Sequence, residues 1–232
     1  MEQLMRWETH AHTAEGSACA SASAVDMVRG CKAAGYDGIF ITDHFYHGNT
    51  AVPRDLPWNE WVTRFCAGYH HGKEEGDKIG LQVCFGWEYS WSGNDFLTYG
   101  LSPQWLLAHP ETTTLTPYEY LKLVKESGGC IVHAHPFRQA WYVQAIRLVP
   151  DVVDAVEVYN AANGEEIYNT RAKWYADSFG LKQVAGSDTH WADMFQGGIL
   201  TREPIHSAED YKKVIAEGGI CGIVRKGENE LF

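Results

Sequence analysis

Five short clusters of histidine and carboxylate residues stand out along this chain, and four of them directly follow an apolar, strand-like run. They are His10-Ala11-His12, Thr42-Asp43-His44, Trp87-Glu88-Tyr89, His133-Ala134-His135-Pro136 and Ser187-Asp188-Thr189-His190. Two imidazoles one residue apart at the end of a strand point to the same side and can share a metal ion. Neutral imidazole and carboxylate are also the ligands that zinc, manganese and iron accept in catalytic sites. The repeated pattern therefore predicts a metal site.

The number of donors in these clusters exceeds what one ion needs. A carboxylate can bridge two ions ~3.5–4 Å apart, and such a pair can bind a phosphoryl group while activating water. Glu88 is the candidate for this bridge, because it alone among the strand-end clusters has no histidine beside it.

The elements that must position the clusters alternate between short apolar strands and helices. The predicted strands cover residues 6–9, 38–41, 81–85, 130–132, 152–158, 183–185 and 219–224, and residues 95–99 could form a further strand. Helices are predicted from Ser23 to Gly35, from 58 to 75 with Gly76 as terminator, from Thr116 to Ser127, from 165 to 179 and from Ser207 to Glu217. This alternation predicts parallel strands, in a barrel or an open doubly wound sheet.

Both architectures gather function at the carboxyl ends of the strands. Polar clusters after at least four separate strands converge more naturally on the mouth of a barrel, so we predict an α/β barrel. The pattern shows no linker, and a chain of 232 residues is an ordinary length for one such unit, so residues 1–232 are expected to form a single domain.

The composition of the chain limits the kinds of molecule that it could bind. A net charge of −11 argues against long nucleic acid, which needs a basic stripe, but bound cations would still admit a small anionic substrate. The six cysteines show no C-x-x-C spacing and indicate reduced thiols. No apolar run approaches ~20 residues, and Met1-Glu2-Gln3-Leu4 does not resemble a signal peptide, so we expect no membrane span and a cytoplasmic location. The oligomeric state stays open.

Motifs of rival chemistries are missing from the sequence. There is no G-x-S-x-G elbow, no G-x-x-x-x-G-K-[ST] phosphate loop, no H-E-x-x-H helix and no G-x-G-x-x-G after a strand. The order H-x-H, T-D-H, strand-end Glu, H-x-H-P and S-D-x-H instead resembles the PHP (polymerase and histidinol phosphatase) superfamily, over residues 10–190. The resemblance implies a distorted, TIM-like, seven-stranded β/α barrel. It also implies two or three divalent ions (Zn, Mn or Fe) and hydrolysis of phosphate esters.

The resemblance assigns roles to individual residues. It implies that His10, His12, Glu88 and Asp188 hold a first ion, and that His135 shares a second ion with the bridging Glu88. It implies that His44 and His190 hold a third ion.

Two positions depart from the pattern that the resemblance implies. Asp95 stands in place of a histidine that many relatives carry on the strand after the bridging glutamate. Ala18 stands where many relatives carry a loop ligand, so Glu15, or less favourably Cys19, would complete the third position. His133 is either a ligand or a partner that hydrogen-bonds to one. The residues expected to take part in catalysis are His10, His12, Glu88, Asp188 and His190.

Two features suggest contacts with a substrate. Arg138, three residues after His135, would suit a phosphate through its planar fork, although a surface salt bridge is an equal alternative. Aromatic residues near the strand ends could wall a pocket, although packing in the core is the commoner role; they are Phe45, Tyr46, Trp87, Tyr89, Trp91, Phe137, Trp141 and Trp191.

The predicted function is therefore a metal-dependent phosphoesterase that acts on a small phosphorylated substrate, with hydroxide formed on the ions attacking phosphorus. An amidohydrolase or lactonase that uses the same ions on a carbonyl group is the main alternative. A non-catalytic metal-binding module is a third possibility, which so many costly donors at one site make less favourable.

Overall fold

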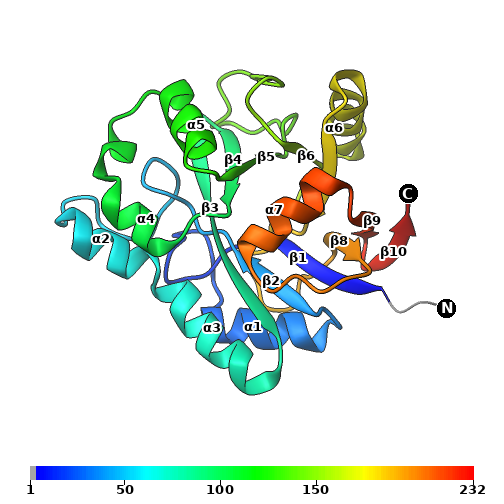
Figure 1. Ribbon diagram of the computed structural model, residues 1–232, viewed down its shortest axis with the longest axis horizontal. Helices are drawn as coiled ribbons and strands as arrows, with labels where there is room; N and C mark the ends of the chain where they lie inside the picture. The colour runs from blue at the N-terminus through cyan, green and yellow to red at the C-terminus, as the bar shows by residue number, and fades with distance from the viewer. Residues whose placement is uncertain (1–3) are drawn as a thin grey trace.

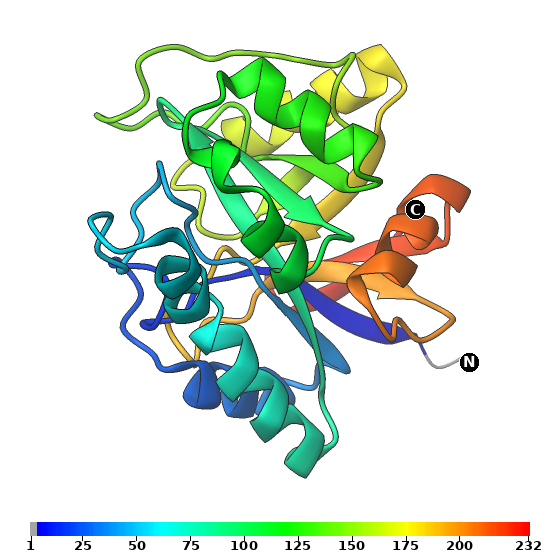
Figure 2. The same ribbon diagram turned by 60° about the vertical axis from the view of Figure 1, so that its left-hand side comes forward.

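A computed structural model describes residues 4–232 and shows a mixed α/β fold built on one curled sheet (Figure 1). In this part of the chain the strands are β1 (Met5–Ala11), β2 (Gly38–Ile41), β3 (Gln82–Trp91), β4 (Asn94–Tyr99), β5 (Cys130–Ala134), β6 (Ala155–Asn160), β7 (Lys182–Gly186), β8 (Gly197–Thr201), β9 (Ile220–Arg225) and β10 (Glu228–Leu231). The helices lie around the outside of the curl, as Figures 1 and 2 show. They are α1 (Ala24–Ala33), α2 (Trp58–Phe65), α3 (Ala67–Ile79), α4 (Pro103–Ala108), the 3₁₀ helix η1 (Pro110–Thr113), α5 (Pro117–Glu126), α6 (Glu166–Phe179) and α7 (Ala208–Glu217).

The strand order is β10-β9-β8-β1-β2-β3-β4-β5-β6-β7. Strands β1, β2 and β3 run parallel to one another, and so do β5, β6 and β7. Strand β4 is antiparallel to both of its neighbours, and β8, β9 and β10 extend the sheet antiparallel beyond β1. The expectation of parallel strands throughout is therefore wrong. The ten strands within residues 4–232 form a partial barrel, and the seven-strand count is not confirmed.

A tight turn explains why β4 reverses direction. Only Ser92 and Gly93 join β3 to β4, and both have positive φ, at 51° and 83°. Two-residue loops of this kind match the right-handed twist of paired antiparallel strands, and glycine adopts positive φ without steric cost. The further strand at residues 95–99 is thus present, but as the second arm of a hairpin.

The curl brings the end of the β7 segment back to β1. Thr189 follows β7, and its carbonyl accepts a hydrogen bond from the His12 amide at 2.9 Å. The Thr9 hydroxyl, on β1, donates to the Ala185 carbonyl of β7 at 2.7 Å. Because of these contacts the carboxyl ends of β1 and β7, which lie far apart in the sequence, meet at one place.

Helix boundaries follow local chemistry where a side chain caps the first turn. Ser23, Thr116 and Ser207 all accept a hydrogen bond from a backbone amide three residues later, which satisfies a donor that a helix leaves unpaired. Thr116 and Glu119 form the reciprocal capping box that the sequence predicts. Every helix in residues 4–232 is too short or too polar to span a membrane.

The region predicted as one helix from 58 to 75 contains two, α2 and α3, which meet at Cys66. Helix α3 also continues past Gly76 and ends at Gly80, whose φ of 70° is the left-handed conformation typical of a helix C-terminus. Gly76 has a different role, because an added Cβ would lie 2.6 Å from both the Leu81 carbonyl oxygen and a Val83 methyl carbon. It lets α3 pack closely against β3.

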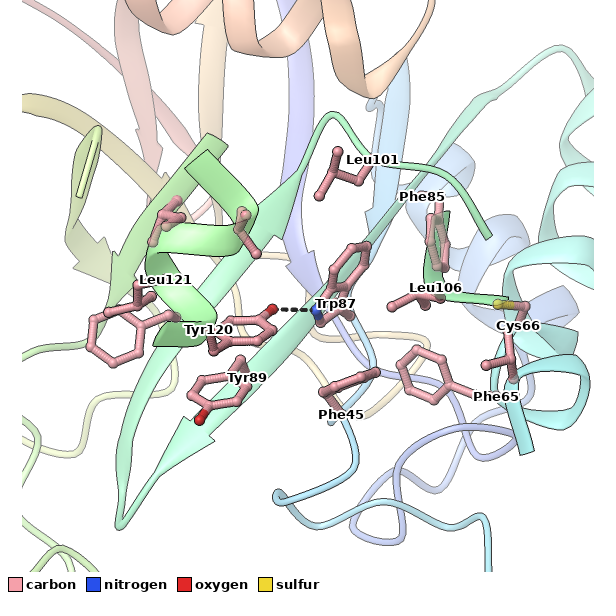
Figure 3. Packing of buried hydrophobic residues seen from close by; sticks show 14 of the residues in the cluster. Phe45, Phe65, Cys66, Phe85, Trp87, Tyr89, Leu101, Leu106, Tyr120 and Leu121 are labelled. Atoms are coloured by element: carbon pink, nitrogen blue, oxygen red, sulfur yellow. Dashed lines mark hydrogen bonds between the residues drawn. The ribbon is translucent and has the colours of Figure 1, made fainter. Parts of the chain in front are cut away.

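A large aromatic cluster supports β3 from one side (Figure 3). Trp87 and Tyr89 of this strand pack against Tyr120 of α5, and the Tyr89 and Tyr120 rings stack with centroids 3.7 Å apart. The Trp87 indole donates a hydrogen bond to the Tyr120 hydroxyl at 2.6 Å. Glu88, between these two residues, belongs to the other face of the strand. The cluster therefore holds the backbone that carries the central carboxylate.

Candidate metal centre

Glu88 is at the middle of the cluster of histidines and carboxylates, and it is 1% exposed. Its Oε2 lies 2.6 Å from His44 Nδ1, while its Oε1 lies 3.2 Å from His135 Nε2 and 3.3 Å from His10 Nε2. These three histidines come from the ends of β2, β5 and β1. The Glu88 carboxylate thus contacts three imidazoles from three different strands, as a bridging ligand requires.

Asp188 forms a second centre beside Glu88. Its Oδ1 lies 3.2 Å from His12 Nε2 and 3.5 Å from His10 Nε2, and its Oδ2 accepts from Arg138 Nη2 at 2.7 Å. Asp188 and His135 have φ angles of 54° and 29°. Positive φ is uncommon for residues other than glycine, and such strain is typical of functional sites.

Donor atoms from these residues converge in groups whose members all lie within 4.8 Å of one another. The groups are His10, His12 and Glu88; His10, His135 and Asp188; Glu88, Asp95 and His135; and His12, His44 and His190. Several of the buried atoms in them have no hydrogen-bond partner among residues 4–232, namely His10 Nε2, His12 Nε2, His44 Nδ1, Glu88 Oε2 and Asp95 Oδ1. Unpaired buried polar atoms are costly, so a cluster of imidazole and carboxylate donors in this state fits divalent metal ions.

The charges in the cluster suit metal binding. Burial favours a neutral carboxyl, yet the neighbouring histidines and Arg138 hold the pKa values of Glu88 and Asp188 well below their usual range. Burial, together with the charge of His44, lowers the pKa of His12 to about 3. The carboxylates are therefore ionised and His12 is neutral, which are the forms that bind metal. Burial opposes protonation of His10 and His44, but the neighbouring carboxylates raise their pKa values well above the usual range, so a bound ion would displace a proton from each.

Glu157, on β6, orients two of the histidines and was not predicted from the sequence. Its Oε1 accepts from His10 Nδ1 at 3.0 Å, and its Oε2 accepts from the His135 amide at 3.0 Å. Bonding at Nδ1 fixes the tautomer that leaves His10 Nε2 free for a metal. An added Cβ at Gly186 would lie 2.7 Å from Glu157 Oε1, so glycine makes room for this carboxylate. The one available signal was a glutamate inside an apolar strand.

A second set of hydrogen bonds orients His12. Its Nδ1 donates to Ser17 Oγ at 3.0 Å, and the Ser17 hydroxyl donates to Asp43 Oδ1 at 2.7 Å. The backbone amide of His44 also donates to Ser17 Oγ, at 3.0 Å. Asp43 is thus not a member of the donor groups, and it positions the loop that supports them.

Glu8 lies beneath His10 and is fully buried. Its Oε1 accepts from the backbone amides of His10 and Ser187, each at 2.9 Å. Burial outweighs these two contacts and raises the pKa of Glu8 to about 7.

Two of the predicted ligands, Glu15 and His133, lie outside the donor groups. The Glu15 carboxylate accepts from the Ala24 amide at the start of α1, at 3.0 Å, so it caps that helix and is not in any of the donor groups. The His133 ring stacks on Phe96 with centroids 4.7 Å apart, and no donor group includes it. Strand alternation alone would place His133 and His135 on the same face, but His135 follows the end of β5 and has a φ of 29°, so its side chain does not keep the strand direction of His133. Asp95, by contrast, joins the Glu88 and His135 group.

Cys19 occupies the place that Glu15 was expected to take. Its Sγ lies 3.1 Å from His190 Nε2. Burial opposes ionisation, but contacts with His190 and His44 more than offset it and lower the pKa of the Cys19 thiol to about 6.

A cavity of about 580 Å³ opens over the donors. Arg138 lines it, and its Nη2 and Nε atoms bond Asn160 at 2.7 Å and Asn163 at 3.0 Å, so its guanidinium is held at the site and not in a surface salt bridge. The aromatic residues Trp141 and Tyr142 line the cavity as well, and Trp141 is 96% exposed. Phe45, Trp87 and Tyr89, also considered as pocket walls, belong to the buried core cluster.

No protein-family model and no curated protein matches the sequence, whereas several solved structures match the fold. A two-domain protein from Bacteroides vulgatus, containing a predicted PHP-like metal-dependent phosphoesterase, matches with a TM-score of 0.74 and 14% identity, over 98% of this chain and 66% of that one. A protein from Bifidobacterium adolescentis, described as a predicted metal-dependent phosphoesterase, matches with a TM-score of 0.55 and 17% identity, over 81% and 88%. An amidohydrolase from Chromobacterium violaceum, solved with sulfate and no metal, matches with a TM-score of 0.58 and 14% identity, over 95% and 98%.

These matches establish the class of fold. The chain has the architecture of PHP-like metal-dependent phosphoesterases, which confirms at the level of fold the resemblance found in the sequence. It spans about two thirds of the length of the Bacteroides protein. Identities of 14–17% with these proteins are evidence of a shared fold alone.

Proposed function

We propose that this protein is a metal-dependent hydrolase of small phosphate esters, with two or three divalent ions (Zn, Mn or Fe) held by the donors around Glu88. The observation that carries the proposal is the sharing of Glu88 between two donor groups, one with His10 and His12 and one with Asp95 and His135. Asp188 joins His10 and His135 in a third group. A bridging carboxylate at the centre of such groups is typical of two-metal phosphoesterase sites.

The ions, when bound, would stabilise charge on the phosphoryl oxygens and lower the pKa of coordinated water to ~7. The chain's own residues prepare the site for that chemistry. Glu157 and the Ser17 hydroxyl accept hydrogen bonds from His10 Nδ1 and His12 Nδ1, which keeps the proton of each ring on Nδ1, so both Nε2 atoms stay available.

Arg138 is the proposed contact for the phosphate. Three buried or part-buried partners, Asn160, Asn163 and Asp188, engage its Nη2 and Nε atoms. Its remaining nitrogen, Nη1, has no hydrogen bond to residues 4–232 and can donate to an anion in the cavity. A guanidinium held in this way loses little freedom when the substrate binds.

The test is a phosphatase assay on purified protein of known metal content. Phosphomonoesters and small phosphodiesters, including histidinol phosphate and mononucleotides, are incubated with the protein before and after treatment with a chelator. We expect release of phosphate or alcohol that the chelator abolishes and that zinc, manganese or iron restores. Metal-loaded protein that turns over none of these esters would refute the proposal.

An amidohydrolase or lactonase remains the second candidate, because a structural neighbour from Chromobacterium violaceum is named an amidohydrolase. The same donors could bind ions that polarise a carbonyl group. The two activities are separated by adding amides and lactones to the panel and by testing inorganic phosphate as an inhibitor. Turnover of these substrates without turnover of any phosphoester would favour the second candidate.

A further inference from the structure

The donor group of His12, His44 and His190 lacks a ligand once the other groups are filled. His12 Nε2 belongs to this group and also to the group with His10 and Glu88. A single nitrogen lone pair binds one ion, and His12 Nε2 also lies near both carboxylates, 3.2 Å from Asp188 and 3.6 Å from Glu88. If His12 serves the first ion, the third position keeps only two imidazoles, fewer than the three protein ligands typical of a catalytic zinc site.

Glu88, whose Oε2 lies 2.6 Å from His44 Nδ1, and Asp188 already belong to the other groups, so within residues 4–232 the remaining candidates beside this pair are Glu15, Asp43 and Cys19. Glu15 is turned toward the first turn of α1, where it accepts from the Ala24 amide. Asp43 already accepts three hydrogen bonds, from the Thr13 amide and hydroxyl and from the Ser17 hydroxyl, at 2.6 to 2.7 Å. Cys19 remains, with its Sγ 3.1 Å from His190 Nε2 and also within hydrogen-bonding reach of His44.

The loop that carries Cys19 is fixed on both sides of this residue. The Ala18 amide donates to the Asn49 carbonyl at 2.8 Å, and the Ala20 amide donates to the Ser17 carbonyl at 3.1 Å. Ser17, in turn, is bonded to His12 and Asp43. The thiol therefore lies beside two imidazoles because the same hydrogen bonds that orient His12 also hold its loop, and it lines the cavity.

We propose that Cys19 is a thiolate ligand of the third metal position, with His44 and His190 as its imidazole partners. The inference rests on the metal centre of the proposed function and adds a ligand to it. The thiol loses its proton to solvent as the sulfur–metal bond forms, so charge balances without an oxidant or reductant. Three protein ligands leave one position of a tetrahedral ion open to substrate. Because thiolate is a soft ligand, this position binds zinc in preference to manganese or magnesium.

The direct test is spectroscopic. Apoprotein is loaded with Co²⁺ and its near-ultraviolet spectrum is recorded for the unmodified chain, for Cys19→Ser and for Cys221→Ser. Cys221 is a second free, partly exposed cysteine that lies outside the cavity, so it is the matched control. We expect a thiolate-to-cobalt charge-transfer band in the unmodified chain and in Cys221→Ser, and loss of this band in Cys19→Ser. An identical band in all three proteins, or no band in any of them, would overturn the proposal.

Metal content and thiol reactivity give two further readouts. Loss of a residue that only hydrogen-bonds to a metal ligand typically lowers metal affinity by about 10- to 100-fold. Loss of a ligand itself should cost at least as much, so Cys19→Ser should weaken zinc binding at this position by roughly 10- to 100-fold or more. Elemental analysis should then find about one ion fewer, with the ions around Glu88 retained. Zinc should also protect Cys19, and not Cys221, from alkylation in the unmodified protein. Equal alkylation of Cys19 with and without zinc would contradict ligation.

Failure of this inference is distinguishable from failure of the proposed function. A protein that hydrolyses phosphoesters but shows no cobalt–thiolate band keeps the function and loses the Cys19 ligand. A protein with the band and no turnover of any phosphoester keeps the ligand and loses the function. Because Cys19 is exposed and serine is nearly isosteric, unchanged thermal unfolding of the metal-free Cys19→Ser variant is the control for folding.

Discussion

The two faces of β3 carry opposite kinds of chemistry. On one face Trp87 and Tyr89 pack into the aromatic cluster, where the Trp87 indole bonds the Tyr120 hydroxyl (Figure 3). That hydroxyl also lies 2.9 Å from the Thr98 hydroxyl. On the other face Glu88 stands among histidines, and its Oε2 has no hydrogen-bond partner in residues 4–232 although His44 Nδ1 is only 2.6 Å away.

The difference separates stability from function within one strand. Paired polar atoms in a packed cluster stabilise the fold, whereas unpaired buried donors cost free energy unless a ligand completes them. The aromatic face therefore provides rigidity, and the Glu88 face uses that rigidity to hold donors ready for metal ions.

Substitution of Glu88 should affect the catalytic face alone. Glu88→Gln removes the charge that two ions would share, so activity should fall by several kcal/mol of transition-state stabilisation, roughly 10³-fold or more. Elemental analysis should find about one ion fewer, because a bridge serves two positions. Glu60→Gln, at an exposed position on α2, is the control and should retain both metal and activity. Normal metal content with normal turnover in Glu88→Gln would contradict the assignment.

The buried Glu8 carboxyl, which lies beneath the site, should make the free energy of unfolding depend on pH. Its pKa rises from 4.5 to about 7 on folding, chiefly by burial, so protonation favours the folded state. The corresponding stabilisation, roughly 3 kcal/mol, is present in full below pH 4.5 and is lost as the pH rises through about 7. Glu8→Gln should remove this dependence.

The measurement is urea unfolding of metal-free protein at several pH values between 4.5 and 8. The exposed Glu126→Gln variant serves as the control and should follow the unmodified protein. Parallel curves for Glu8→Gln and the unmodified protein would show that the buried carboxyl does not titrate in this range.

Tyr120→Phe should affect the stabilising face alone. It deletes the hydroxyl that bonds Trp87 and Thr98, leaving a buried indole donor unpaired, at a cost of about 1–2 kcal/mol in the free energy of unfolding. Metal content should stay the same. Tyr118→Phe, an exposed position on the same helix, is the matched control and should change neither property. A loss of bound metal in Tyr120→Phe at a temperature where it remains folded would show that the two faces are coupled.

Trp141→Ala should have the smallest effect, confined to the substrate. Trp141 lines the cavity but is 96% exposed, so its removal should leave stability unchanged. Loss of a ring contact worth about 1 kcal/mol would raise KM by roughly 3- to 10-fold with little change in kcat. Trp174→Ala, another exposed tryptophan outside the cavity, is the comparison. Equal KM values for the two variants would remove Trp141 from the substrate site.

The sequence alone indicated the side chains that make up the four donor groups, although it also put forward Glu15 and His133, which lie outside them. This was possible because the signals are local. A buried strand followed by His or Asp can be recognised from neighbouring residues alone, as at His12, His44 and Asp188. Helix starts such as Thr116 were equally predictable, because a cap depends only on neighbouring residues.

The tertiary structure decided whatever depends on distant partners. Glu157 orients His10 because β6 lies beside the returning β7, and Cys19 rather than Glu15 lies beside His190 because the loop turns the Glu15 side chain to α1. Strand direction at β4 likewise follows from a hairpin that helix–strand alternation does not reveal. Pairing and loop paths are long-range choices, set by the free energy of the whole fold, so a local pattern cannot specify them.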